Sequence, residues 1–148
     1  MLGKLLREGH SVAIPWGLAW AERWHRERGA NYVLEPLWDR GVSPETLRPW
    51  CIAWIRNCPA KVNPTFLLEK LIHALPKDAG LNAIARQWLA AAPPEHGSWS
   101  FVWQALMEVY PDDADLYRQG RRFLEEAPDT HGSWPHTWRT CRQPCRMR

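Results

Sequence analysis

The chain has 148 residues, of which 45% are hydrophobic and 24% charged, and 19 Lys and Arg against 16 Asp and Glu give a net charge of +3. This composition is typical of one globular domain and excludes a disordered chain, while the charge is too small to indicate nucleic acid by itself. Because the chain has no long apolar run, an early charged N-terminal segment and only four cysteines, we expect no membrane span, no signal peptide and a reducing cytoplasm.

A repeat of 34–35 residues accounts for most of the 11 tryptophans. His96-Gly97-Ser98-Trp99 recurs 35 positions later as His131-Gly132-Ser133-Trp134. Toward the N-terminus, steps of 34 align Trp88 with Trp54 and Trp54 with Trp20. Units of this length consist of two helices whose apolar faces become buried only when neighbouring units stack. In chain order, the predicted units cover residues 1–28, 31–59, 64–93 and 98–128, followed by a partial unit over 133–148.

The unit over residues 98–128 begins with a predicted helix that ends near Tyr110. Ser98 is expected to cap its N-terminus, and Pro111 cannot continue it. Apolar residues spaced three and four apart form one helical face. These residues are Trp99, Val102, Trp103, Leu106 and Tyr110.

The second helix of this unit is predicted from Leu116 to Glu126, with Pro128 after its end. Leu116, Gly120, Phe123 and Leu124 are expected to face inward. The acidic residues before it are Asp112, Asp113 and Asp115. They could form a cation site, but capping of the helix and a solvated turn explain them better, because the loop lacks the ligand spacing of a calcium loop.

Gly120 aligns with Ala85 and Cys51, so we expect two helices to approach closely there. The repeat length, this small residue before a large aromatic residue, and the closing proline resemble the tetratricopeptide type of repeat. The first helix departs from that family, since it carries Ser-Trp-x-x-Val-Trp-x-x-Leu from Ser98 to Leu106 in place of the Trp, Leu-Gly and Tyr signature. This pattern is similar to tryptophan-rich repeats of bacterial signalling and defence proteins, which lie beside an NTPase or effector domain.

The resemblance covers residues 11–141 and implies an all-α fold. The expected architecture is a right-handed α-solenoid of about four helix-turn-helix repeats plus a partial C-terminal repeat, forming a single domain over residues 1–148. The resemblance also implies a binding role without an enzymatic activity.

Nine tryptophans fall in repeat columns on apolar helix faces and are expected in the core. They are Trp16, Trp20, Trp50, Trp54, Trp88, Trp99, Trp103, Trp134 and Trp138. Trp24 and Trp38 have no repeat partner of the same type, so they are the better candidates for exposed, functional aromatic residues.

Columns of residues beside the core face of the first helices are candidates for a binding groove, because this side lines the concave surface in tetratricopeptide-like arrays. One column reads Trp38, Ile72, Met107 and Arg142, another reads Asp39, His73, Glu108 and Gln143, and a third reads Glu35, Glu69, Gln104 and Arg139. The groove candidates are Trp38, Asp39, Glu69, Ile72, His73, Gln104, Met107 and Glu108. The alternative is that Ile72 and Met107 pack against the next repeat.

No catalytic or phosphate-binding motif occurs in the chain, and we expect neither an enzyme nor a cofactor. A zinc set of His131, His136, Cys141 and Cys145 is chemically possible. The repeat argues against it, because His131 corresponds to His96, and both cysteines occupy apolar columns of the core face.

The partner is expected to be a protein or peptide, bound in the groove of a non-enzymatic scaffold or adaptor. After Trp134 and Trp138 no second helix is predicted, so this aromatic face is expected to contact another copy of the chain or a neighbouring domain. The alternative function is a ligand-sensing or regulatory segment of a larger signalling or defence NTPase or effector. RNA or DNA binding is less favoured, since residues 61–138 hold seven Lys and Arg against ten Asp and Glu.

Overall fold

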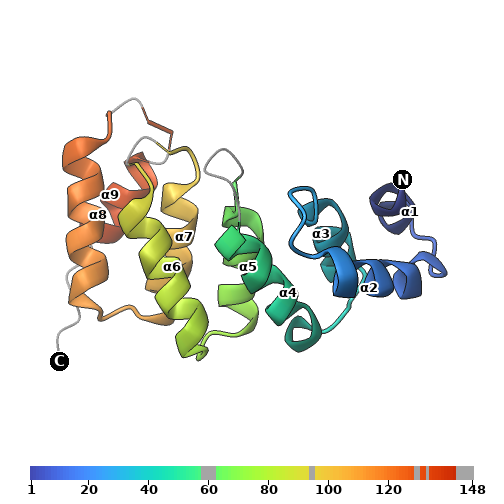
Figure 1. The fold of residues 1–148 in the computed structure, drawn as a ribbon. Coiled ribbons are helices and arrows are strands. Elements are labelled where there is room, and N and C mark those ends of the chain that lie inside the picture. Colours follow the sequence, from blue (N-terminus) through green and yellow to red (C-terminus); the bar gives the residue numbers. More distant parts are fainter. Residues whose placement is uncertain (58–62, 94–95, 129–130, 133, 143–148) are drawn as a thin grey trace. The chain divides into compact units, whose positions relative to one another are not determined.

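The computed structural model describes residues 1–57, 63–93, 96–128, 131–132 and 134–142 (Figure 1). Within these ranges all regular secondary structure is α-helical, which confirms the predicted all-α class. The nine helices of the described residues are α1 (Leu2–Arg7), α2 (Ala13–Trp24), α3 (Asn31–Asp39), α4 (Pro44–Asn57), α5 (Thr65–Ala74), α6 (Ala79–Ala91), α7 (Trp99–Val109), α8 (Ala114–Glu126) and α9 (Trp134–Arg142). None of the described helices combines the length and the apolar character that crossing a bilayer requires.

Two compact units make up the chain, one over residues 1–74 and the other over residues 75–148. In the first unit, α1 packs on α2 and α3, and α3 and α5 each pack on α4. In the second unit, α6 packs on α7, while α7, α8 and α9 pack on one another. The single domain over residues 1–148 stays a prediction.

Helices α1 and α3 end in the same way, at glycines with left-handed backbone conformations. Gly9 has a φ of 90° and Gly41 a φ of 82°, a region that side chains with a Cβ rarely adopt. The side chain of Arg40 then covers the open end of α1, because its Nε donates to Leu6 O over 2.7 Å and its Nη2 to Arg7 O over 2.8 Å. A cation at this end also complements the helix dipole.

Helices α7 and α8 differ from their predicted bounds only at their ends. The last residue of α7 is Val109, and α8 begins at Ala114, two residues before the prediction. The earlier start follows from Asp113, whose side chain accepts hydrogen bonds from Asp115 N and Leu116 N. Asp113 of the acidic turn therefore caps α8, which confirms the predicted capping role. Ser98 occupies the N-cap position of α7 as predicted, but its side chain makes no capping hydrogen bond.

The expected close approach at the column of small residues is confirmed. Gly120 on α8 is buried, and a Cβ added there would lie 2.5 Å from Trp103 Cζ2 and 2.9 Å from Cys141 Sγ. Its counterparts Cys51 and Ala85 are both fully buried. One step of 34 before Cys51, Gly17 on α2 is also buried. The column therefore extends into the first predicted unit.

The repeated motif makes the same tryptophan contact twice in the second unit. Trp99 Nε1 donates to Leu89 O over 3.1 Å, and Trp134 Nε1 donates to Leu124 O over 3.3 Å. In each case the indole N–H of a tryptophan at the start of a helix donates to a backbone carbonyl near the end of the preceding helix. The tryptophan of the motif thus fixes one helix against the next.

The histidine of the motif also recurs in one role. His96 packs edge-on against Trp88 with ring centroids 5.3 Å apart, and His131 packs edge-on against Phe123 with centroids 5.4 Å apart. Edge-on packing of rings at this distance is favourable. Each histidine, which lies in the connection between two helices, therefore packs against the preceding helix.

The tryptophan columns are only partly buried. Trp54, Trp99 and Trp103 are at most 4% exposed, as predicted for the core. The prediction is wrong for Trp16, which is 60% exposed, and for Trp138, which is 41% exposed. Small residues occupy the buried face of α2 in place of large ones, so Trp16 lies on its outer side. The remaining column members, Trp20, Trp50, Trp88 and Trp134, are half-buried.

Candidate functional site

A cavity in the second unit gathers three of the predicted groove residues. Gln104, Met107 and Glu108 lie on one face of α7, because residues three and four apart are neighbours on a helix. They line a cavity of about 400 Å³ together with residues of the α7–α8 turn, α8 and α9. The face of α7 on which the repeat columns predicted a groove therefore borders a cavity.

Helix α9 contributes the cationic side of the cavity. Arg139 and Thr140 line it from α9, and Arg139 is exposed. Glu108 is exposed on α7, so the cavity carries one acidic and one basic side chain from two different helices. Gln104 is half-buried and supplies an amide, which both donates and accepts hydrogen bonds.

Met107 forms an apolar part of the cavity wall and is 6% exposed. Of this groove candidate, therefore, only a small part of the side chain is open to the cavity. Tyr117 and Pro111 complete the wall from α8 and the α7–α8 turn. Neither residue belongs to a first-helix column, so the repeat alignment alone could not find them.

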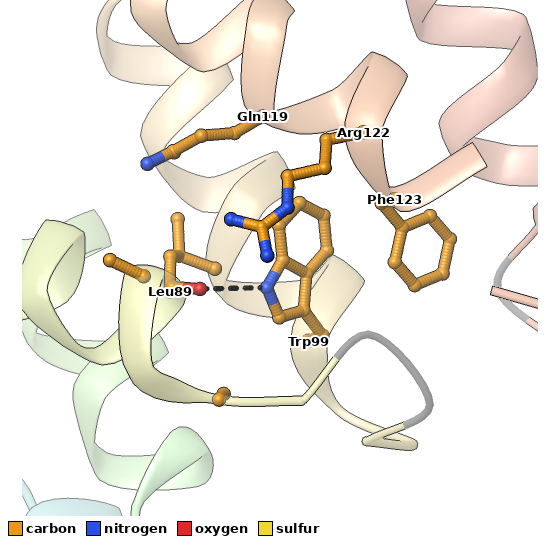
Figure 2. Close-up of a pocket in the computed structure, with 7 residues that line it drawn as sticks. Leu89, Trp99, Gln119, Arg122 and Phe123 are labelled. Atoms are coloured by element: carbon orange, nitrogen blue, oxygen red, sulfur yellow. Dashed lines mark hydrogen bonds between the residues drawn. The ribbon is translucent and has the colours of Figure 1, made fainter. Parts of the chain in front are cut away.

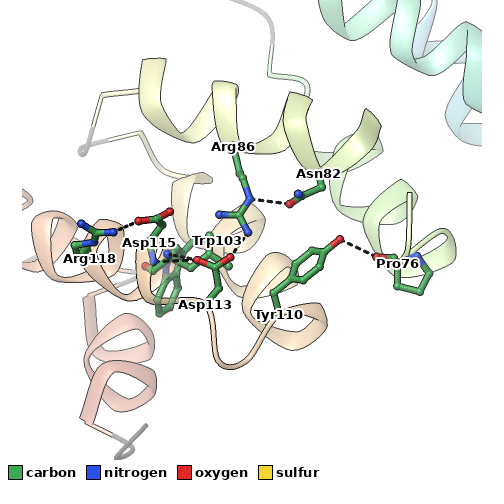
Figure 3. Close-up of polar contacts among 9 residues, drawn as sticks. Pro76, Asn82, Arg86, Trp103, Tyr110, Asp113, Asp115 and Arg118 are labelled. Carbon is green, nitrogen blue, oxygen red and sulfur yellow. Dashed lines mark hydrogen bonds and ion pairs between the residues drawn. The ribbon is translucent and has the colours of Figure 1, made fainter. Parts of the chain in front are cut away.

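A network of polar contacts fixes the turn that ends at this cavity (Figure 3). Arg86 of α6 donates from Nη2 to Asp113 Oδ2 over 2.5 Å and from Nε to Asn82 Oδ1 over 2.8 Å. The guanidinium lies 5.6 Å from the ring centroid of Tyr110, whose hydroxyl group donates to Pro76 O over 3.3 Å. The hydrogen bond from Arg86 holds the pKa of Asp113 below its usual range.

The predicted groove residues of the first unit make a different arrangement. Asp39 on α3 accepts a hydrogen bond from Lys70 Nζ on α5 over 2.6 Å, and that ammonium group lies 4.6 Å from the ring centroid of Phe66. Glu35, one turn before Asp39, is half-buried, and burial raises the pKa of its carboxyl group. Charges of α3 and α5 are thus paired with each other.

Other groove candidates in the first unit vary in exposure. Ile72 is 3% exposed, so its side chain does not line an open surface of α5. The alternative, packing of Ile72 against the next repeat, stays a prediction. Trp38 and Glu69 are half-buried, and His73 is exposed. Trp24 is 43% exposed, as predicted, and lies beneath the guanidinium of Arg23 at 5.2 Å from its ring centroid.

Trp134 and Trp138, the predicted interface residues, stack on each other along α9. Their ring centroids are 5.5 Å apart with an angle of 15° between the planes. The predicted contact of this pair with another copy or a neighbouring domain stays a prediction.

The proposed zinc set is described only in part. The side chain of His136 and the whole of Cys145 lie outside the described residues. His131 contacts Phe123, and Cys141 is half-buried beside Gly120, where burial raises the pKa of its thiol. In the described part of the chain, no three His, Cys, Asp or Glu side chains are grouped as metal ligands.

The chain matches no protein-family model, no curated protein and no solved structure.

Proposed function

We propose that the chain is a non-enzymatic, cytoplasmic binding module of the tetratricopeptide-like α-solenoid type, and that it holds an extended segment of a partner protein. The observation that carries the proposal is the cavity of about 400 Å³ lined by Gln104, Met107, Glu108 and Arg139. The stacking of repeats is supported by the contacts of Trp99 and Trp134, which recur at an interval of 35 residues.

The chemistry of the cavity suits a peptide. A cavity of this volume falls within the range of small ligand sites, so it can accept a few residues of an extended chain. The amide of Gln104 can pair with a peptide group, because its NH₂ can donate to the peptide C=O and its carbonyl oxygen can accept from the peptide N–H. Met107 offers an adaptable apolar surface to a side chain. Glu108 and Arg139 would select a peptide with a basic and an acidic residue.

Selection from a random peptide library displayed on phage, with the whole chain immobilised, tests this proposal. We expect selected peptides to carry both charges, and Arg139→Glu to weaken their binding by about tenfold or more, because a charge pair becomes a repulsion. Glu108→Arg should shift the selected sequences from basic to acidic residues at one position.

The matched control is Arg118→Glu, which reverses an exposed arginine of α8 outside the cavity and should leave peptide binding unchanged. Peptides whose binding ignores both Glu108 and Arg139 would contradict the proposal. So would a library that yields no binding peptide.

A further inference from the structure

Three helices carry an exposed aromatic side chain at one position of the repeat. Tyr32 on α3, Phe66 on α5 and Phe101 on α7 follow one another at intervals of 34 and 35 residues. They are 63%, 49% and 51% exposed, respectively. Single exposed aromatic residues are common on protein surfaces, but a column that keeps an exposed ring in three repeats is better explained by a ligand that contacts the rings.

In the first unit, two of these rings share one face with every Asp, Glu, Lys and Arg side chain of α3 and α5. Each member of this face lies three or four residues from another member on the same helix, so the members are neighbours. We call this surface the α3–α5 face, and its residues are Tyr32, Glu35, Asp39, Phe66, Glu69 and Lys70. None of them lines the cavity proposed to bind a peptide.

Lys70 shows how this face holds a cation. Its ammonium group lies 4.6 Å from the ring centroid of Phe66 and donates to Asp39 Oδ1 over 2.6 Å, so it contacts a ring and a carboxylate at once. Its charge also acts on the carboxyl group of Glu35, more strongly than the charge of Arg7 on α1 does. Because α3 and α5 together carry three carboxylates and one ammonium group, the face attracts further cations.

The charge of the face decides among the ligands that stack on exposed rings. Single-stranded nucleic acid stacks its bases on such rings, but the carboxylates of Glu35, Asp39 and Glu69 would repel its phosphates. An anionic membrane surface is disfavoured for the same reason. An apolar segment would bury these carboxylates without a partner, which is costly. A cationic segment satisfies the rings and the carboxylates together.

We propose that the α3–α5 face binds a basic segment of a partner protein through arginine side chains. A guanidinium group stacks its plane on an aromatic ring and keeps its N–H groups for a carboxylate, whereas an ammonium group is a compact and strongly hydrated charge. Tyr32 and Phe66 supply the rings, and Glu35 and Glu69, three residues after them, supply the carboxylates. An arginine that stacks on Phe66 displaces the ammonium group of Lys70 from this ring.

Fluorescence anisotropy of two labelled peptides with the full chain tests this proposal. One peptide alternates glycine with arginine and the other alternates glycine with lysine, and both have amidated C-termini, so they differ only in the cationic group. We expect saturable binding of the arginine peptide and about fivefold or more weaker binding of the lysine peptide. Added salt should weaken the binding of both peptides, because it screens the charges.

Variants of the rings locate the site. We expect the double variant Tyr32→Leu/Phe66→Leu, which keeps apolar side chains but removes both rings, to bind the arginine peptide about fivefold or more weakly. Tyr32→Phe keeps the ring and should bind as the unchanged chain does. The matched control Trp16→Leu removes a ring of α2 that is 60% exposed and lies outside the face, and it should also leave the affinity unchanged. Circular dichroism of each variant establishes that it is folded before titration.

Lys70→Met provides a test that a loss of folding cannot imitate. It removes the cation that contacts Phe66 and Asp39, so we expect it to tighten binding of the arginine peptide about threefold or more. The control Lys4→Met removes an equal charge from an exposed position of α1 and should change the affinity by less than about twofold. Glu108→Gln in the cavity of the second unit should leave the affinity unchanged, which separates this proposal from the proposed function.

Four results would overturn the proposal. The first is the absence of saturable binding of the arginine peptide, and the second is equal affinity for the two peptides. The third is an affinity for the arginine peptide that stays the same in folded Tyr32→Leu/Phe66→Leu or in Lys70→Met. The fourth is a double variant that abolishes binding of a labelled oligothymidylate, or self-association measured by light scattering, which would assign the face to nucleic acid or to a second copy of the chain.

Discussion

Gly120 leaves no room for a side chain, since an added Cβ would lie 2.5 Å from Trp103 Cζ2. Trp103 cannot move away easily, because it is fully buried and its Nε1 donates to Leu116 O over 2.7 Å. We therefore expect Gly120→Ala to lower the free energy of unfolding by about 1–3 kcal/mol, the usual cost of overpacking. Urea denaturation monitored by circular dichroism measures the difference.

Gly97 provides the control for this substitution. A Cβ added at Gly97 would meet nothing within 4 Å, so Gly97→Ala should change the free energy of unfolding by less than about 1 kcal/mol, and the sign should be stabilising because the unfolded chain loses freedom. Equal losses in the two variants would show that the contact with Trp103 does not decide the effect.

Cys51 should be chemically silent in the folded chain. It is fully buried, and burial raises the pKa of its thiol to about 12, so the reactive thiolate is nearly absent at pH 8. We expect iodoacetamide to label Cys51 at pH 8 at least tenfold more slowly in the folded chain than in urea, as mapped by mass spectrometry of peptides. Half-buried Cys141 is the internal reference and should label faster. Labelling of Cys51 at the rate of the unfolded chain would contradict its placement.

At the scale of elements, the ion pair between Arg86 and Asp113 joins α6 to the beginning of α8 (Figure 3). The pKa of Asp113 is lower in the folded chain than in the unfolded chain, mainly because of the hydrogen bond from Arg86. Its carboxylate therefore stabilises the fold above the unfolded pKa of about 3.9, and this stability is lost as the pH falls through the lower folded pKa.

Asp113→Asn tests this contribution. We expect the variant to be less stable than the unchanged chain by about 1–2 kcal/mol at pH 7, since a charge-assisted hydrogen bond is lost. The difference should shrink as the pH falls from about 4, the unfolded pKa, toward the lower folded pKa, because the unfolded chain binds the proton first. Thermal unfolding of both chains between pH 3 and pH 7 follows this change. A difference that is constant across this range would mean that the charge of Asp113 is unimportant.

The helices themselves could be predicted because apolar residues recur at helical spacing and prolines separate the segments. The positions of α7 and α8 followed from Trp99, Val102 and Phe123 in this way, and the repeat predicted a small residue at Gly120. Side-chain exposure could not be predicted equally well. Trp16 occupies the same column as half-buried Trp50, but the buried face of α2 consists of small residues, which leaves Trp16 exposed. The repeat pattern does not show which neighbouring helix covers a column.

Of the cavity proposed to bind a peptide, only the residues on α7 could be predicted from the sequence. The first-helix columns identified Gln104 and Glu108, because periodicity places them beside the buried face of α7. Tyr117 enters the same cavity from α8. Gln119 of α8 and Trp99 of α7 line a smaller cavity of about 70 Å³ in the second unit (Figure 2). Both arrangements depend on contacts between helices, which the spacing within one helix does not specify. The shape of each cavity therefore depends on how side chains from separate helices pack together.

For the whole molecule, the proposed solenoid has a testable consequence for how stability is distributed. In a linear array each repeat contacts only its neighbours, so a local loss of stability spreads over a short distance. We expect Gly120→Ala to lower hydrogen-exchange protection most in α7, α8 and α9 and least in α1, α2 and α3, as measured by mass spectrometry of the full chain. An equal loss in all helices would contradict a linear array.

The paired contacts of Trp99 with Leu89 and Trp134 with Leu124 have an evolutionary consequence. Each joint between two helices is encoded within a short stretch of the gene, because both partners lie 10 residues apart in the chain. Duplication of a segment as long as the repeat copies the joint together with the helices that it connects. Such a protein can therefore gain or lose whole repeats during evolution without requiring a new kind of contact between its helices.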